Sequence, residues 1–278
     1  MPTVTPRKQA KKVYLSVDFE GAACVVGEVG KPMATLGSGL DCQTPIFQQA
    51  QRIVTAEVNA AVRGSLAAGA TEVIVDDAHG SGHNLLYEQL HPEAKVLIGS
   101  PRPRRFCLLD ESFAGIVLLC YHAMAGVENG VLCHSYSSES IHRMILNGQP
   151  IGEIGFDAAF AGELGVPVIL VSSDETGCAE AKRCLGEDLI TVATKKGLGR
   201  NCALCLAPQK VDALTEAGMK QALLSAKTRA PYRPKGPYVL ERVYKWETQA
   251  EANSHAKGAE RVDPYTVRWR GDKISELL

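Results

Sequence analysis

Runs of apolar residues alternate along this chain with stretches in which apolar positions recur every three or four residues. Apolar runs rich in β-branched residues and bounded by polar or turn-forming residues predict buried strands. Such runs occupy residues 13–18 (VYLSVD), 72–79 (EVIVDDAH), 114–122 (AGIVLLCYH), 166–174 (VPVILVSSD) and 189–194 (LITVAT). Strands that alternate with helices are typical of an α/β fold with a largely parallel sheet.

Helical periodicity marks three segments between or after these strands. The first has a stripe of apolar residues at spacings of three and four, and Gly69 is suited to end that helix. The stripe consists of Ile46, Ala50, Ile53, Val54, Val58, Ala61, Val62 and Leu66. Residues 152–164 and 207–226 are predicted to form the other two helices.

A proline cluster at residues 229–238 (RAPYRPKGPY) marks a linker or a long loop. It is followed by strand-like residues 238–245 and 265–270, with a polar helical stretch between them. This part is either a small α+β subdomain or an addition to the main sheet. We therefore predict an α/β fold, with a largely parallel central sheet flanked by helices and a smaller α+β C-terminal portion.

The same patterns suggest how the chain is divided. Residues 1–12 are short, polar and basic, and we expect a disordered tail there. Residues 13–205 are expected to form the α/β region, and 206–278 a helix plus the small α+β portion, either separate or within the same domain.

Composition narrows the class of protein. The chain has 278 residues, of which 45% are hydrophobic, enough for a substantial core. Its 30 basic and 31 acidic residues leave a net charge of -1, so no basic excess points to nucleic acid or an anionic membrane. We find neither the apolar run of a signal peptide, about 7–15 residues, nor the roughly 18 apolar residues of a membrane helix. We expect a cytoplasmic protein.

Nine scattered cysteines without a secretion signal are typical of free, buried thiols. Cys202 and Cys205 form a Cys-x-x-Cys pair, but a structural zinc site needs four ligands. We expect both to be reduced core residues without a metal.

Polar residues interrupt the strands at one end only. The carboxyl ends of strands form the ligand crevice of open α/β sheets, so these side chains should meet at one face. They are Asp18 and Glu20 after the first strand, Asp76, Asp77 and His79 after the second, and His122 after the third. Glu153 lies in the first turn of a following helix, where a carboxylate suits the helix N-terminus.

Carboxylates and imidazoles that converge in one crevice are the ligands expected for zinc or a similar divalent ion. A cation would also neutralise the repulsion between the carboxylates of Asp18 and Glu20. Taken singly, each residue has a simpler explanation. Asp18 and Glu20 could cap a loop, His79 could be a turn residue, and His122 could be a core histidine.

At these residues the sequence resembles the bacterial zinc-dependent D-aminopeptidase family of the dipeptide-transport operon type. The similar segments are SVDFEG, VDDAH, GIVLLCYHAMAGVENGVLCHS and NGQPIGEIGFDAAFAGELGVPVILVSSD, in that order. The similarity runs from about residue 12 to the C-terminus and is strongest between residues 71 and 175. The chain departs from the family pattern at residues 22–49 and at Cys133.

The resemblance implies a site with two zinc ions, although other divalent metals would suit similar ligands. Asp18 would bridge both metals. Glu20 and His122 would complete one site, and His79 and Glu153 the other. Each ion would then have three protein ligands and room for water, as an open catalytic zinc site needs.

The resemblance places the family's catalytic histidine at His134, which is not a metal ligand. It implies an aminopeptidase that hydrolyses the N-terminal residue of short peptides, containing D-amino acids, by a metal-activated water with His134 as acid/base. The substrate would be a short peptide or an amino-acid amide, whose free amine could bind a metal or a carboxylate such as Asp77. Family members form rings, so we expect a homo-oligomer and, by analogy, a decameric ring.

Two other functions remain compatible with the residues. One is a metal-dependent amidase or deacylase that acts on another small amide, since fold does not fix function. The other is a non-catalytic, metal-loaded oligomeric binding protein. His134 argues against the binding protein, because a binder has no need of a histidine that is not a ligand.

Overall fold

The computed structural model describes residues 11–27 and 45–277. At its centre lies a six-stranded sheet in which every neighbouring pair of strands is parallel. The strand order is β3-β2-β1-β4-β7-β8. The strands are β1 (Lys12–Val17), β2 (Glu72–Asp77), β3 (Ala94–Leu97), β4 (Phe113–Leu119), β7 (Val168–Ser173) and β8 (Ile190–Ala193). The order reverses between β1 and β4, and such a switch point is where open α/β sheets bind ligands.

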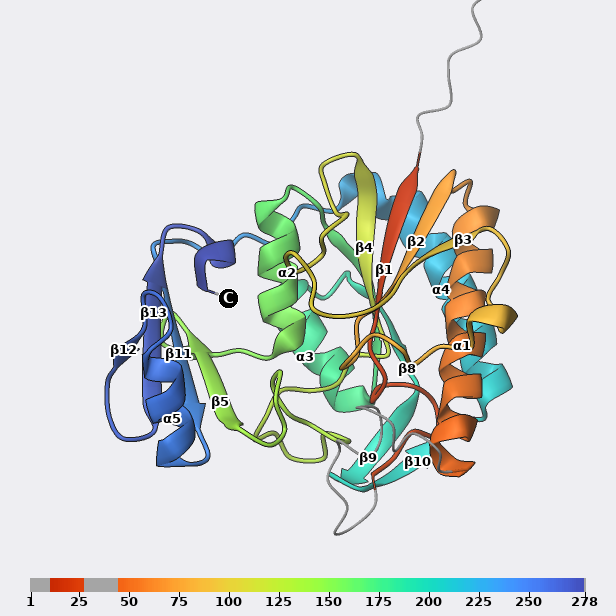
Figure 1. Cartoon of the computed structure of the whole chain (residues 1–278). Helices are drawn as coiled ribbons and strands as arrows, with labels where there is room; N and C mark the ends of the chain where they lie inside the picture. Colours follow the sequence, from red (N-terminus) through yellow and green to blue (C-terminus); the bar gives the residue numbers. More distant parts are fainter. Residues whose placement is uncertain (1–10, 28–44, 278) are drawn as a thin grey trace, which may run out of the picture.

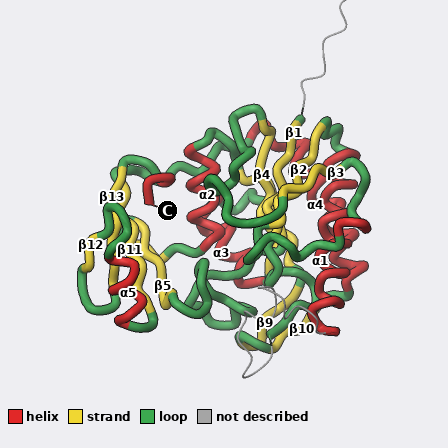
Figure 2. Tube along the Cα trace, in the orientation of Figure 1, coloured by secondary structure: helices red, strands yellow, loops and turns green. Residues whose placement is uncertain are grey.

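Helices cover both faces of this sheet (Figures 1 and 2). On one face lie α1 (Pro45–Ala67) and α4 (Pro208–Ser225), and on the other α2 (Glu153–Glu163) and α3 (Glu175–Leu185). Alternate residues of a strand point to opposite faces. Val13 and Leu15 accordingly pack with α1 and α4, whereas Tyr14 packs on the side of α2.

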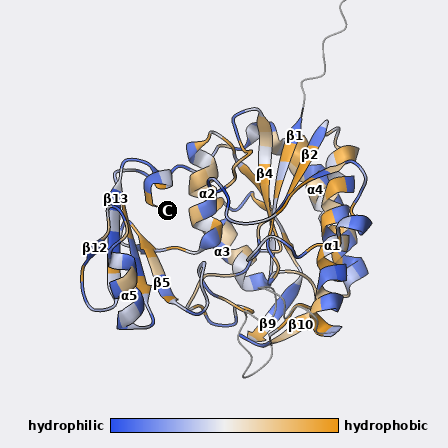
Figure 3. Ribbon diagram, in the orientation of Figure 1, coloured by the Kyte–Doolittle hydropathy of each residue, from blue (hydrophilic) through white to orange (hydrophobic). Residues whose placement is uncertain are grey.

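The local sequence explains where these helices begin and end. α1 turns an apolar stripe to the sheet and a hydrophilic face outward (Figure 3). Gly69 follows it with a φ of 85°, the left-handed conformation that glycine adopts readily. Asp174 caps α3, since its side chain accepts a hydrogen bond of 2.7 Å from the backbone amide of Gly177. Pro208 occupies the first turn of α4, where no amide donor is needed.

A smaller antiparallel sheet packs outside α2 with strand order β12-β13-β11-β5-β6. Buried Leu240 and Trp269 of this sheet belong to the same apolar cluster as Phe156 of α2. The strands are β5 (Ile141–Leu146), β6 (Gln149–Pro150), β11 (Tyr238–Tyr244), β12 (Glu260–Arg261) and β13 (Thr266–Gly271), with α5 (Glu247–Ser254) between β11 and β12. A two-stranded hairpin of β9 (Lys195–Gly199) and β10 (Cys202–Cys205) follows β8, and short 3₁₀ turns are Tyr87–Gln89, Ala226–Thr228 and Ile274–Leu277.

The predicted α/β fold with a largely parallel, helix-flanked sheet is confirmed. β3, β5 and α3 were not predicted. The boundary expected at residue 205 does not coincide with the division between the two sheets. α4, after that boundary, packs against α1 and β8, and β5, before it, pairs with the C-terminal strands. Most of the expected tail, residues 1–10, and residues 28–44 of the divergent segment lie outside the described residues.

The expectation that Cys202 and Cys205 are core residues is wrong. Cys202 is exposed and Cys205 is half-buried, because β10 belongs to a hairpin outside the main sheet. All eight cysteines within residues 11–27 and 45–277 are free. None of the helices in these same ranges is long and apolar enough to cross a membrane.

Candidate metal centre

The candidate metal centre lies where the strand order reverses. Asp18 directly follows β1 and His122 follows β4, the neighbouring strand. The two strand ends are tied together, since the backbone amide of Asp18 donates to the carbonyl of Leu119 at 2.9 Å. His79 follows β2, and Glu153 is the first residue of α2. Chain direction in a parallel sheet thus brings these four side chains to one edge.

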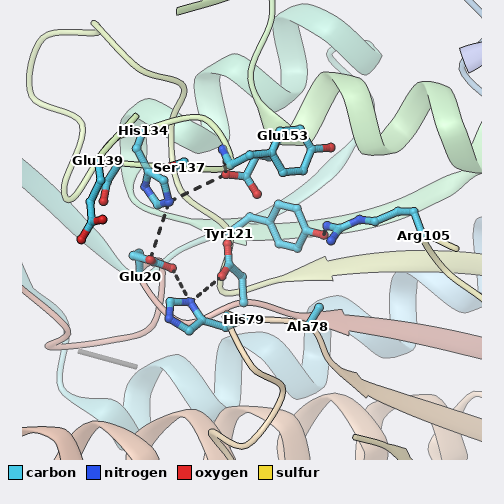
Figure 4. Close-up of a pocket in the computed structure, with 13 residues that line it drawn as sticks. Glu20, Ala78, His79, Arg105, Tyr121, His134, Ser137, Glu139 and Glu153 are labelled. Carbon is cyan, nitrogen blue, oxygen red and sulfur yellow. Dashed lines mark hydrogen bonds and ion pairs between the residues drawn. The ribbon is translucent and has the colours of Figure 1, made fainter. Parts of the chain in front are cut away.

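His79 contacts both carboxylates of the SVDFEG segment (Figure 4). Its Nδ1 lies 3.0 Å from Asp18 Oδ1 and 3.2 Å from Glu20 Oε2. All three side chains are buried or nearly so. The second strand therefore supplies an imidazole directly to the acidic pair that follows the first.

His122 lies across from this group. Its Nε2 is 3.1 Å from Glu153 Oε1 and 3.5 Å from Asp18 Oδ2. The ring of His122 stacks on that of His134, with centroids 3.8 Å apart and planes inclined by 14°. His134 Nε2 lies 3.8 Å from Glu153 Oε1 and 3.9 Å from Glu20 Oε1. Asp18 therefore faces His79 with one oxygen and His122 with the other.

The structure brings together every predicted site residue. Two compact groups of donor atoms, each within 4.8 Å, are formed by Asp18, Glu20 and His79 and by His122, His134 and Glu153. This grouping differs from the partition that the resemblance implied, in which Glu20 accompanies His122 and His79 accompanies Glu153. The position of Asp18 between the groups is that expected of a bridging carboxylate.

The donor set fits zinc. Nδ1 of His122 lies 3.0 Å from the carbonyl oxygen of Ala123, and Nδ1 of His134 lies 2.9 Å from that of Leu132. With Nδ1 held at a carbonyl, the Nε2 atoms of both rings point toward the carboxylates, and for His122 this is the usual orientation of a zinc-binding histidine. Nε2 of His122 is buried, and its nearest carboxylate oxygen is Glu153 Oε1 at 3.1 Å.

The distances between donor atoms agree with this assignment. Zinc–nitrogen and zinc–oxygen bonds of about 2.0–2.1 Å place the ligands of a tetrahedral ion about 3.3 Å apart. The contacts between imidazole and carboxylate atoms here span 3.0–3.9 Å.

Burial and the attraction between imidazoles and carboxylates dominate the electrostatics of the centre. Burial, reinforced by the charge of Glu20, raises the pKa of Asp18 to about 7. For His79 and His122, burial opposes the charged form, but the adjacent carboxylates outweigh it and raise the pKa of each imidazole. Burial, with the nearby His122, lowers the pKa of His134 to about 4. His134 is therefore a neutral imidazole at pH 7, able to accept a proton.

The centre opens into a cavity of about 440 Å³. The side of the cavity formed by Arg105, Tyr121 and Tyr136 is held together by Asp157. Its carboxylate accepts hydrogen bonds from the hydroxyls of Tyr121 and Tyr136 at 2.7 and 2.8 Å and from Arg105 Nε at 3.1 Å. The residues that line the cavity are Asp18, Glu20, Ala78, His79, Gly80, Arg105, Tyr121, His134, Tyr136, Ser137, Ser138, Glu139 and Glu153.

Sequence reasoning missed this group. Asp157 lies on α2 within the family-like segment 147–174, but no pattern marked it as a site residue, and Arg105 comes from a loop outside the quoted segments. Tyr121 had one signal, its position immediately before His122.

Asp77 does not have the substrate-binding position suggested from the sequence. It is buried, and its oxygens accept hydrogen bonds from the backbone amides of Asn84 and Leu85 and from the hydroxyl of Tyr87. It does not line the cavity. Asp77 therefore shapes the Gly-rich loop after β2, and His83 in that loop is exposed.

Comparisons with known proteins identify the family to which the chain belongs. Residues 11–278 match the model of the Peptidase M55 family, described as D-aminopeptidase. A D-aminopeptidase of Bacillus subtilis strain 168 is 32% identical over 267 residues, which cover 95% of this chain and 93% of the relative. A solved structure of Bacillus subtilis DppA, described as a zinc-dependent D-aminopeptidase and a self-compartmentalizing protease, aligns with a TM-score of 0.84. That alignment has 31% sequence identity and covers 96% of this chain and 93% of the other. The chain therefore belongs to the D-aminopeptidase family and is a hydrolase that acts on peptide bonds.

Proposed function

We propose that this protein is a dinuclear zinc aminopeptidase that removes the N-terminal residue, of D configuration, from short peptides. The observation that carries the proposal is the convergence of three carboxylates and three imidazoles at one edge of the sheet, with the Nε2 atoms of His122 and His134 directed inward. Asp18 would be shared between the two zinc sites, since its two oxygens face different histidines. Glu20, His79, His122 and Glu153 would be the other ligands.

Bound zinc would lower the pKa of a water molecule and polarise the scissile carbonyl. His134 supplies the proton transfer. Its Nδ1–H is held by the Leu132 carbonyl, so Nε2 accepts a proton on the side of the cavity and returns it to the leaving amine. The low pKa of His134 suits the first of these steps, because the imidazole is unprotonated when substrate arrives.

The substrate is proposed from the family and the cavity together. The relatives are named D-aminopeptidases, and a cavity of about 440 Å³ has room for a short peptide. We further propose a cytoplasmic homo-oligomer, by analogy with the self-compartmentalizing relative, and a ring of ten subunits as its form.

A metal assay and a substrate panel test this function. Purified protein is analysed for zinc and then assayed on D-alanyl and L-alanyl p-nitroanilides, D- and L-dipeptides, and N-acetylated dipeptides, with and without a chelator. We expect about two zinc ions per chain, activity on unblocked D substrates, and loss of activity with the chelator. Hydrolysis of the N-acetylated compounds at an equal rate would indicate an amidase or deacylase instead, and preference for L substrates would contradict the proposed stereochemistry.

A further inference from the structure

A buried lysine lies directly behind the acidic loop of the metal centre. Lys195 begins β9, and its side chain is only 2% exposed. Lysine is almost never fully buried unless its charge is compensated, because the ammonium loses its hydration. Nothing in the proposed chemistry uses Lys195, so its burial needs another explanation.

The ammonium of Lys195 is enclosed by backbone carbonyls. Nζ donates hydrogen bonds of 2.6 Å to Glu20, 2.7 Å to Ala22 and 2.6 Å to Val25. A lysine ammonium has three donors, so these three carbonyls satisfy it completely. Within the described residues, Nζ forms no ion pair with a carboxylate. All its hydrogen bonds therefore go to the loop that carries the metal ligand Glu20.

The residue before Lys195 extends the same set of contacts. Thr194 is fully buried, and its hydroxyl donates to the carbonyl of Gly21 at 2.6 Å. Thr194 and Lys195 together thus bind the consecutive carbonyls of residues 20, 21 and 22, and also that of Val25. The carboxylate of Glu57 on α1 also contacts this loop and accepts a hydrogen bond of 2.7 Å from the backbone amide of Ala23.

No regular secondary structure holds this loop, so its position depends on individual contacts such as these and the 2.7 Å hydrogen bond from the Gly21 amide to the Cys120 carbonyl. Its residues 20–25 form neither helix nor strand. Gly21 approaches the segment that follows β4 so closely that a Cβ atom there would lie 1.9 Å from the carbonyl oxygen of Tyr121. A backbone held this tightly leaves little freedom to the carboxylate of Glu20, the proposed ligand in this loop. That carboxylate must remain beside two other acids even when no metal ion is bound.

We propose that Thr194 and Lys195 form a positioning clamp that holds the Glu20–Val25 loop in its metal-binding conformation before the metal arrives. The inference rests on the proposed metal function of Glu20. The clamp residues touch neither substrate nor metal. They act through the backbone of the loop, so they should govern metal affinity and loop opening more than the chemical step.

Two substitutions and one matched control test the clamp. Lys195→Met keeps the length of the side chain but removes all three donors, and Thr194→Val removes the hydroxyl at nearly constant shape. Lys196→Met changes the neighbouring lysine, which is exposed. Zinc affinity is measured by competition with a chromophoric chelator, and amide hydrogen exchange of residues 20–25 is followed in metal-free protein.

Removal of a residue that orients metal ligands typically costs about 10–100-fold in metal affinity. We expect a loss of this size in Lys195→Met and a smaller one in Thr194→Val, with at least about tenfold faster exchange of the loop amides in Lys195→Met. Lys196→Met should match the wild type in both measurements. In zinc-saturated Lys195→Met, kcat should recover more fully than the zinc affinity does.

Wild-type zinc affinity and loop exchange in a folded Lys195→Met protein would overturn the clamp. If that variant does not fold, unchanged affinity and exchange in Thr194→Val would do the same. Hydrogen exchange is measured without zinc, so it tests the clamp even if the wild-type protein binds no metal. Absence of metal binding in the wild type would count against the proposed function alone.

Discussion

Asp18 is the single residue on which both proposed zinc sites depend. Its two oxygens face His79 and His122, so Asp18→Asn removes charge from both groups while keeping the shape. We expect this variant to lose both zinc ions, whereas His79→Ala should impair chiefly one site. Metal analysis after dialysis measures this, with Glu111→Gln as an exposed control. Two tightly held ions per chain in Asp18→Asn would show that the ligand assignment is wrong.

Substitution of His134 tests whether this residue is an acid/base catalyst or a metal ligand. Amide hydrolysis needs a proton for the leaving nitrogen, and a positioned acid/base contributes about 10²–10⁴-fold in rate. We expect His134→Ala to keep its zinc and fold and to lose at least about a hundredfold in kcat. His142→Ala, at an exposed position on β5, is the control. Loss of zinc in His134→Ala would make His134 a ligand, as its proximity to His122 and Glu153 allows, and near-normal turnover would remove it from the mechanism.

At the scale of elements, α1 carries a buried acid that links it to the segments that follow β1 and β4. Glu57 accepts hydrogen bonds from the amide of Ala23 at 2.7 Å and from Sγ of Cys120 at 3.3 Å. Burial raises the pKa of its carboxyl from 4.5 to about 7. The folded protein therefore binds this proton more tightly than the unfolded chain, and Glu57 makes folding less favourable as pH rises through that interval.

The variant Glu57→Gln should isolate this effect. Near pH 4.5 it should match the wild type in free energy of unfolding, and by pH 7.5 it should be more stable by up to roughly 3 kcal/mol. Denaturant unfolding of metal-free protein across this pH range measures the difference. Glu251→Gln, at an exposed position on α5, should show no such trend. A difference between Glu57→Gln and wild type that stays constant with pH would contradict the explanation.

The elements that sequence could predict are those whose burial is set by local pattern. β1, β2, β4, β7 and β8 are apolar runs between covering helices, and α1 has a regular stripe. β3 is a short edge strand with exposed positions, and β5 pairs with β11 almost a hundred residues later. The residues of neither strand therefore form a local apolar pattern that predicts a strand. The convergence of Asp18, Glu20, His79 and His122 was predictable because the ends of parallel strands lie at one edge of the sheet.

Supporting residues of the centre lacked any comparable local signal. Lys195 stands beside another lysine in a polar segment, and only the carbonyls of residues 20–25 explain its burial. Arg105 likewise depends on Asp157, which lies 52 positions away in the sequence. Such pairings are set by tertiary contacts and leave no periodicity to detect.

At the scale of the whole molecule, the layers place the cavity at one edge of the main sheet. The relative of known structure is described as self-compartmentalizing, and the proposed ring would enclose this edge. Ten chains of 29.8 kDa would form a particle of about 300 kDa. Light scattering coupled to size-exclusion chromatography measures the mass. A single species with the mass of one chain would contradict the proposed assembly.

The stability of the whole molecule should depend on the metal. Asp18, Glu20 and Glu153 are buried carboxylates at one place, and without a metal ion their repulsion is offset by protonated histidines and, at Glu153, by Arg105. Zinc that binds the folded chain alone stabilises it by about 2.7 kcal/mol per site at a hundred times Kd. For a chain of this size, removal of two ions should lower Tm by about 5–15 °C. Calorimetry of protein treated with a chelator, before and after zinc is restored, measures the shift.

Two controls accompany this measurement. Magnesium should not restore Tm, because it favours octahedral oxygen ligands over imidazoles. The Tm of Asp18→Asn should respond to neither ion. Equal Tm values with and without zinc in the wild type would mean that the carboxylate cluster is stable without a metal.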